Sequence, residues 1–191
     1  MAESIIFILL GGISVTTLIL LFGWSQWFDP RWIVLVFFVL IIPGLYAAFT
    51  TAPFVPSSRK RHVTMLKLAD ITSKDTVYEI GFGGGWLIFQ AAKQAKKAIG
   101  YELSIPLVIF GKLKKLLIGS KANLYFGDMW KQNYDDADII FCYIMPNAMK
   151  RFYKEIWPTL KPGTRLISNA FRIHDLQPTQ EEDSVFVYTK K

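Results

Sequence analysis

Glu79-Ile80-Gly81-Phe82-Gly83-Gly84-Gly85 is the stretch that decides the fold of this 191-residue chain. It ends the β-rich run 76–80 and precedes the segment 86–96, whose apolar residues have helical spacing. Glycines at a strand-to-helix turn allow a ligand to approach the backbone closely, and the free N–H groups of a helix N-terminus favour an anionic group. The stretch therefore indicates a nucleotide-binding turn, although a glycine-rich turn by itself is also common without a ligand.

Strand-like and helix-like segments alternate along the rest of the chain. We expect strands at 76–80, 98–102, 123–127, 137–143, 164–170 and 184–190, and helices at 60–68, 86–96, 105–118 and 147–160. In the helix 105–118, Lys112, Lys114 and Lys115 are expected to face solvent. This alternation predicts an α/β fold, a Rossmann-like doubly wound parallel sheet with its ligand crevice at the carboxyl ends of the strands.

Two acids at the ends of the next two predicted strands indicate what the crevice binds. A dinucleotide site of the form G-x-G-x-x-G would need glycine where Trp86 stands. Glu102, 21 residues after Gly81, can accept hydrogen bonds from ribose hydroxyls. Asp128 can accept from an adenine amino group, while apolar neighbours cover the ring. Taken alone, Glu102 could also be a solvated strand end, and Asp128 a helix N-cap.

The N-terminal part is apolar and predicts a transmembrane helical hairpin over residues 1–50. Its uncharged runs, about 5–24 and 32–49, are each long enough to cross a bilayer. A cleaved signal peptide is the alternative, but the first run lacks a basic start and a second apolar run follows. Arg59, Lys60 and Arg61 follow the second run, whereas the turn between the runs carries only Arg31. The positive-inside rule then predicts that the C-terminal domain faces the cytoplasm.

Charge and cysteine usage narrow the remaining possibilities. Of the 22 Lys and Arg residues, 21 lie beyond residue 50, so the chain joins an apolar leader to a basic remainder. Because the basic remainder follows an apolar leader, we expect its positive surface to contact the membrane lipid bilayer. We expect no nucleic-acid partner. Cys142 is the only cysteine, and with His62 and His174 it forms no metal-ligand spacing, so we expect no metal. The predicted organisation is a hairpin to residue 50, a linker over 51–62 and the α/β domain over 63–191.

The runs 77–85, 100–103 and 127–130 together resemble class I S-adenosylmethionine (SAM)-dependent methyltransferases. More narrowly, the chain resembles the small membrane-associated protein-lysine methyltransferases that modify the ATP synthase c subunit and the adenine nucleotide carrier, with their prokaryotic relatives. The resemblance covers about residues 50–175 and includes the proline-containing run 53–56. It implies the cofactor SAM and a membrane-protein substrate whose lysines are methylated.

The resemblance also implies roles for individual residues. By this resemblance, Glu79 and the glycine turn would bind the methionine moiety of SAM, the Glu102 region would bind the ribose, and the run after the third strand would bind the adenine. The implied cofactor-binding residues are Glu79, Gly81, Phe82, Gly83, Gly85, Glu102, Leu103, Asp128, Met129 and Trp130. Glu102→Ala is then expected to abolish SAM binding and to leave the fold intact. The chain departs from the mitochondrial enzymes by having Glu79 and Gly84 where they usually carry aspartate. It also has a shortened C-terminus, with 20 residues after Phe171.

The acceptor side is less defined by the sequence. A lysine acceptor must lose a proton, and an apolar, aromatic mouth favours the neutral amine. Candidates for that mouth are Tyr143 at the end of the fourth strand, Asn147 shortly after it and Ser57 before the domain, with His174 as a further residue that could face it. Ordinary packing is the alternative for Tyr143. The competing functions are methylation of a lipid, a quinone or another membrane-dissolved small molecule, and a non-catalytic nucleotide-binding membrane sensor.

Overall fold

The chain divides into two compact units, residues 1–42 and 43–191. A computed structural model describes residues 29, 31, 32, 34–38, 42 and 58–191. In the first unit, the described residues 31, 32, 34–38 and 42 are helical, and Arg31 forms an ion pair with Asp29 at 2.7 Å. Within the described parts, no helix is both long and apolar enough to cross a bilayer. The predicted spans 5–24 and 32–49 lie mostly outside the described residues, so the hairpin stays a prediction.

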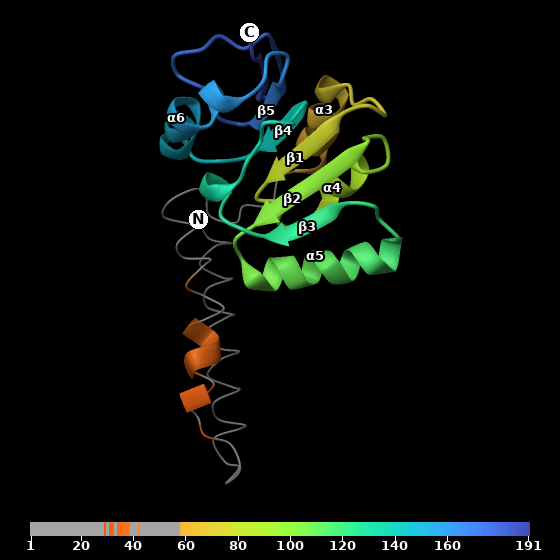
Figure 1. The fold of residues 1–191 in the computed structure, drawn as a ribbon, viewed down its shortest axis with the longest axis vertical. Helices are drawn as coiled ribbons and strands as arrows, with labels where there is room; N and C mark the ends of the chain where they lie inside the picture. Colours follow the sequence, from red (N-terminus) through yellow and green to blue (C-terminus); the bar gives the residue numbers. More distant parts are fainter. Residues whose placement is uncertain (1–28, 30, 33, 39–41, 43–57) are drawn as a thin grey trace. The chain divides into compact units, whose positions relative to one another are not determined.

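The second unit is built on one seven-stranded sheet (Figure 1). Its strands are β1 (Thr76–Ile80), β2 (Lys97–Glu102), β3 (Asn123–Phe126), β4 (Ile139–Cys142), β5 (Arg165–Asn169), β6 (Gln180–Glu182) and β7 (Val185–Thr189). They are arranged in the order β3-β2-β1-β4-β5-β7-β6. The pairs among β1 to β5 are parallel, whereas β7 runs antiparallel to β5 and to β6. The predicted Rossmann-like α/β sheet is thus confirmed.

Helices cover both faces of this sheet. They are α3 (Arg59–Ala69), α4 (Trp86–Ala91), α5 (Ile105–Ile118) and α6 (Pro146–Glu155), with the 3-10 turns η1 (Met129–Lys131) and η2 (Trp157–Thr159). Helices α3, α4 and α5 contribute to the buried clusters on one face, which include Val77 and Leu124. Helix α6 packs on the other face, where Phe152 lies in a cluster with Tyr78 and Tyr188. Burial of both faces explains why β1 and β4 consist of buried residues throughout.

The strand register aligns the carboxyl ends of the strands that carry the predicted site. Ile80 lies opposite Tyr101 of β2 and Cys142 of β4, and Glu102 lies opposite Phe126 of β3. The segments that follow β1, β2, β3 and β4 therefore begin at the same edge of the sheet. This is the edge at which ligands bind in open α/β sheets.

Three details differ from the sequence-based expectations. Helix α4 ends at Ala91 rather than Lys96, because β2 already begins at Lys97 and the chain between them tightens into turns. The strand β6 was not predicted. In α5, Lys112 is exposed as predicted, but Lys114 and Lys115 are only half-exposed, and Leu116 and Leu117 are more exposed than these two lysines.

Candidate functional site

The glycine turn after β1 is held against the end of β2. The backbone N–H groups of Gly81 and Phe82 both donate to the carbonyl of Tyr101, at 2.9 and 3.2 Å. Gly81, Gly83 and Gly85 have φ of 72°, 50° and 73°, values that residues with a Cβ rarely adopt. The turn therefore needs glycine at alternate positions, and its backbone stays open at Gly81, where an added Cβ would meet nothing within 4 Å.

Phe82 anchors this turn in the core. Its side chain is 3% exposed and packs so closely on two glycines that a Cβ at Gly100 or Gly111 would lie 2.8 or 2.7 Å from its ring. A cofactor-binding role for Phe82 was predicted from the sequence. The structure instead buries its side chain between β2 and α5, so only its backbone is available to a ligand.

Glu102 is bonded directly to the glycine turn. One carboxylate oxygen accepts from the N–H of Gly83 at 3.0 Å, and the other accepts from the N–H groups of Leu103 and Ser104, both at 2.9 Å. Glu102 is 8% exposed. Three backbone donors satisfy this buried carboxylate, and their bonds fix the distance between the turn and the end of β2. The predicted pairing of the turn with this acid is thus present in the geometry.

Asp128 lies beside them, because the N–H of Gly127 donates to the carbonyl of Glu102 at 3.0 Å. The Asp128 carboxylate accepts from the N–H of Trp130 at 3.1 Å and so caps η1. The alternative raised from the sequence, an N-cap, therefore applies. It does not exclude ligand binding, since a carboxylate has further lone pairs.

The two residues after Asp128 lie in different environments. Met129 is buried in the core on the α6 side of the sheet. Trp130 is half-buried, and the Arg151 guanidinium lies 4.0 Å from its ring centroid. The indole N–H of Trp130 has no hydrogen-bond partner among the described residues. Trp130 is thus the better placed of the two to contact a ligand.

Glu79 is a buried carboxylate within β1. It is 7% exposed, and its Oε2 atom has no hydrogen-bond partner in the described part of the chain. Burial raises the pKa of Glu79 well above its usual value; a hydrogen bond from the backbone of Ile88 opposes this shift, and the neighbouring Glu102 adds to it. An unsatisfied acid of this kind is costly to the free protein and is characteristic of functional sites.

The acceptor-side candidates are only partly brought together. Tyr143 stacks on Phe171, with ring centroids 6.0 Å apart and planes 19° from parallel, so the ends of β4 and β5 present a joint aromatic surface. Asn147, in the first turn of α6, is exposed, as is His174. Ser57 lies outside the described residues. The predicted roles of these residues remain predictions.

Sequence reasoning missed two contacts at the site. Lys114 of α5 donates to the carbonyl of Gly84 at 3.0 Å and so ties this helix to the glycine turn. Phe171, which follows β5, is the partner of Tyr143. No spacing rule would have found these pairs, because each joins residues about 30 positions apart that only the fold brings together.

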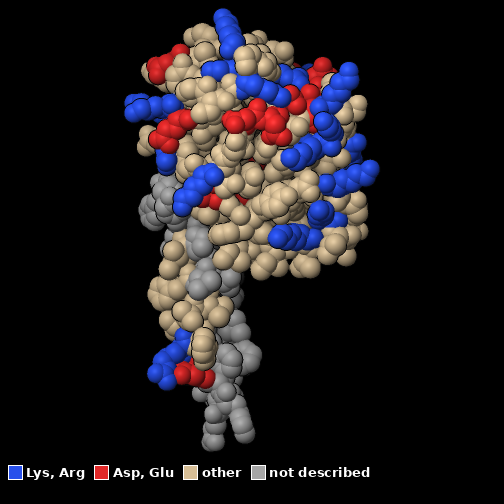
Figure 2. Space-filling view, in the orientation of Figure 1, with Lys and Arg blue, Asp and Glu red and all other residues tan. Residues whose placement is uncertain are grey.

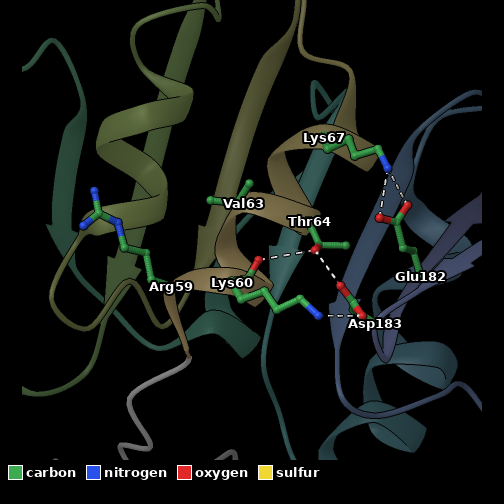
Figure 3. Close-up of a pocket in the computed structure, with 7 residues that line it drawn as sticks. All are labelled: Arg59, Lys60, Val63, Thr64, Lys67, Glu182 and Asp183. Carbon is green, nitrogen blue, oxygen red and sulfur yellow. Dashed lines mark hydrogen bonds and ion pairs between the residues drawn. The ribbon is translucent and has the colours of Figure 1, made fainter.

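An open groove elsewhere on the domain does not contain any predicted site residue (Figure 3). It lies between α3 and the β6–β7 turn, and its lining charges are largely neutralised. Lys60 pairs with Asp183 at 3.1 Å and Lys67 with Glu182 at 2.8 Å. These pairs are better explained as contacts that hold α3 against the C-terminal hairpin. Among the described residues, no group of three or more His, Cys, Asp or Glu side chains could hold a metal ion.

Alanine substitutions at two neighbouring glycines of the turn, Gly85 and Gly84, are expected to differ in their effect on stability. Gly85→Ala is expected to lower the free energy of unfolding by about 2 kcal/mol or more, because a left-handed conformation costs an alanine about 1–2 kcal/mol. In addition, the new Cβ would lie 2.7 Å from the Phe89 ring. Gly84→Ala is the matched control: its Cβ would meet nothing within 4 Å, so urea unfolding should change by less than about 0.5 kcal/mol. Equal effects of the two substitutions would contradict this account of the turn.

Comparison with known proteins adds an independent observation. The model of the family described as "ANTKMT methyltransferase domain" matches residues 79–180. A protein-lysine N-methyltransferase of Saccharolobus islandicus is 28% identical over 132 residues, which cover 67% of this chain and 82% of that protein. The human ATP synthase C-subunit lysine N-methyltransferase is 27% identical over 121 residues, which cover 62% of this chain. That alignment spans 52% of the human protein, about half its length.

A solved structure is similar in fold. The RNA methyltransferase from Salinibacter ruber, in complex with S-adenosyl-L-homocysteine, superposes with a TM-score of 0.68 at 24% identity. The match covers 71% of this chain and 94% of that one. At this identity the likeness establishes the fold of the domain.

Proposed function

Since the chain belongs to the ANTKMT methyltransferase domain family, a family of SAM-dependent class I methyltransferases, we propose that it methylates lysine side chains of membrane proteins. Two relatives named as methylating protein lysines support this substrate class. The observation that supports its cofactor site is the bond from Gly83 of the glycine turn to Glu102, because it holds together the two parts of the proposed SAM-binding crevice.

The residues present fit SAM on their chemistry. Glu79 offers a buried carboxylate oxygen without a partner among the described residues, which suits the positively charged methionine moiety. Glu102 and Asp128 offer acceptors for ribose and adenine groups, and Trp130 offers an indole face and an unsatisfied N–H. When bound, SAM supplies a methyl group that its positive sulfur has already activated. The protein then has to align the acceptor and to exclude water, which is a substantial part of catalysis in such transfers.

The aromatic pair Tyr143 and Phe171 is proposed to form the acceptor side. A lysine with a free pKa near 10.4 is largely charged at neutral pH and must lose a proton before its nitrogen can attack. An apolar aromatic surface disfavours the ammonium form by desolvation and so lowers the pKa of the incoming amine. Asn147 and Ser57 are proposed to orient that amine through their polar side chains.

The membrane location is also part of the proposal. The described helical residues of the second predicted span are apolar, and Trp32, Val34, Leu35, Val36, Phe38 and Ile42 are all exposed. Exposed apolar helix surface is costly in water and is expected where lipid covers it. With Arg59, Lys60 and Arg61 following the span, the methyltransferase domain is proposed to face the cytoplasm.

The test of this function uses SAM carrying a labelled methyl group. The full-length chain, reconstituted in membranes from cells that lack it, is expected to label protein bands, with the label recovered as methyl-lysine after hydrolysis. Label confined to the organic extract would instead indicate methylation of a lipid or quinone. SAM binding without any labelled product would favour the nucleotide-binding sensor.

A further inference from the structure

Helix α5 presents an apolar surface to the outside of the domain. Only Val108 and Gly111 of its 14 residues are buried. Its exposed apolar side chains include Leu116 at 76% and Leu117 at 87%, together with Ile109, Phe110, Leu113 and Ile118 at 53–57%. At about 100° per residue, Ile109, Leu113, Leu116 and Leu117 project on the side opposite Gly111. We call the surface formed by these exposed apolar side chains of α5 the α5 face. It is a larger apolar surface than the scattered exposed leucines of an ordinary soluble domain provide.

The charges around the α5 face are of one sign. Residues 103–127 contain no Asp or Glu, whereas they include Lys112, Lys114, Lys115 and Lys121. Figure 2 shows the corresponding region of the domain, where α5 runs in Figure 1, as tan surface with blue side chains. Lys114 donates to the carbonyl of Gly84 and, like Lys115, is only half-exposed, which leaves Lys112 and Lys121 as the exposed cations beside the leucines. An apolar face bordered by lysines is the pattern of helices that lie in the interface of anionic membranes.

The α5 face is less suited to a second copy of the chain. A symmetric contact of two α5 helices would bring the lysines of both copies together without an acid within 103–127 to pair with them. Anionic lipid headgroups instead complement these cations. The chemistry of the face therefore favours a lipid surface over self-association.

The position of the domain in the chain supports the same partner, if the membrane anchoring proposed above holds. The second predicted span ends at residue 49, and α3 begins at Arg59. The residues between them, even fully extended at about 3.5 Å each, hold the start of the domain within roughly 35 Å of the bilayer. The α5 face thus stays at a high effective concentration near lipid.

We propose that α5 docks flat on the anionic cytoplasmic leaflet, with Leu113, Leu116 and Leu117 inserted at the headgroup boundary and Lys112 and Lys121 contacting lipid phosphates. This docking fixes the domain at the membrane surface independently of the anchor. Because Lys114 bonds the carbonyl of Gly84, the docked helix also carries the glycine turn with it.

A fluorophore at residue 117 tests this docking in the full-length chain. Cys142 is buried and burial raises the pKa of its thiol to about 12, so a thiol-reactive bimane labels an introduced cysteine selectively. Leu117→Cys places the probe on the α5 face, and Lys154→Cys places a control probe on exposed α6, which covers the other side of the sheet. Each labelled protein is reconstituted in phosphatidylcholine–phosphatidylglycerol vesicles with a doxyl spin label at a shallow or a deep position of the acyl chain.

The proposal expects shallow-label quenching at position 117 and none at position 154, because interfacial helices insert only about 5–10 Å. Replacing phosphatidylglycerol by phosphatidylcholine should weaken docking by roughly fivefold for each lysine at the surface. A blue-shifted but unquenched probe at 117 would mean that protein covers the face and would overturn the proposal. Vesicles that float with the chain while the probe stays solvent-exposed would overturn docking and leave anchoring intact. Failure to float, with no quenching, would overturn both.

Discussion

Replacing Glu102 by alanine is expected to reduce the affinity for SAM by at least about 100-fold, because two hydrogen bonds to a charged group contribute about 3 kcal/mol or more together. The carboxylate is 8% exposed and already positioned by Gly83, Leu103 and Ser104. A ribose held there would meet an acceptor that needs no rearrangement. Isothermal titration of the full-length variant with SAM measures the loss.

The structure does not support the sequence-based expectation that Glu102→Ala leaves the fold intact. Truncation leaves three backbone N–H groups without their acceptor, and each unsatisfied buried donor costs about 1–3 kcal/mol. Glu102→Ala should therefore also lower the free energy of unfolding, by about 3 kcal/mol or more, rather than leave the fold unaffected. Glu102→Gln keeps one acceptor oxygen for some of these three N–H groups. It should therefore recover most of the free energy of unfolding but only part of the affinity for SAM.

A surface carboxylate is the matched control. Glu182 pairs with Lys67 at 2.8 Å in a half-exposed ion pair, so Glu182→Ala should cost less than about 1 kcal/mol and leave SAM affinity unchanged. If Glu102→Ala bound SAM as tightly as the unmodified chain, the assignment of the crevice would be wrong.

The sequence predicted those parts of the fold for which local patterns suffice. The glycine turn, the acid that ends β2 and the acid that follows β3 lie at one edge of the sheet, because parallel strands end there and the strand lengths follow from apolar runs. Helix α5 was predicted with its observed bounds, 105–118. These features depend on short-range chemistry that each segment carries itself.

Features that depend on what a segment packs against were not predictable. Lys114 and Lys115 of α5 were expected to face solvent as Lys112 does, but a helix with apolar residues on every side does not reveal which of these residues pack inward. Gly111 decides this, because its missing side chain lets Phe82 approach, and the apolar opposite side is left outside. The bond from Lys114 to Gly84 and the Tyr143–Phe171 stack likewise join segments whose proximity only the fold establishes.

Glu79 is expected to make the free protein less stable as pH rises. Its pKa is raised in the folded chain by burial, so the folded state holds a proton that the unfolded state releases near 4.5. The protonated carboxyl therefore contributes its full stability only below the unfolded-state pKa of about 4.5. As the pH rises from there through the raised folded-state pKa, this contribution is lost and unfolding becomes progressively more favourable. Glu79→Gln, which cannot ionise, should be more stable than the unmodified chain at pH 8 by about 1–3 kcal/mol, and the difference should vanish at acid pH.

The same substitution should act in the opposite direction on SAM binding. The predicted contact of Glu79 is with the cationic methionine moiety, which binds the ionised carboxylate better than the protonated acid, so binding expels the proton. Affinity of the unmodified chain should then rise with pH until the raised pKa is passed, whereas Glu79→Gln should bind about 10–100-fold more weakly at pH 8 and lose this pH dependence. Denaturant unfolding and SAM titration at several pH values measure both slopes. If Glu79 only packed, its substitution would change stability and SAM affinity in the same direction. Stability that falls with pH while SAM affinity rises, with both pH dependences lost in Glu79→Gln, would identify a carboxylate whose cost to the free protein is offset by its cofactor.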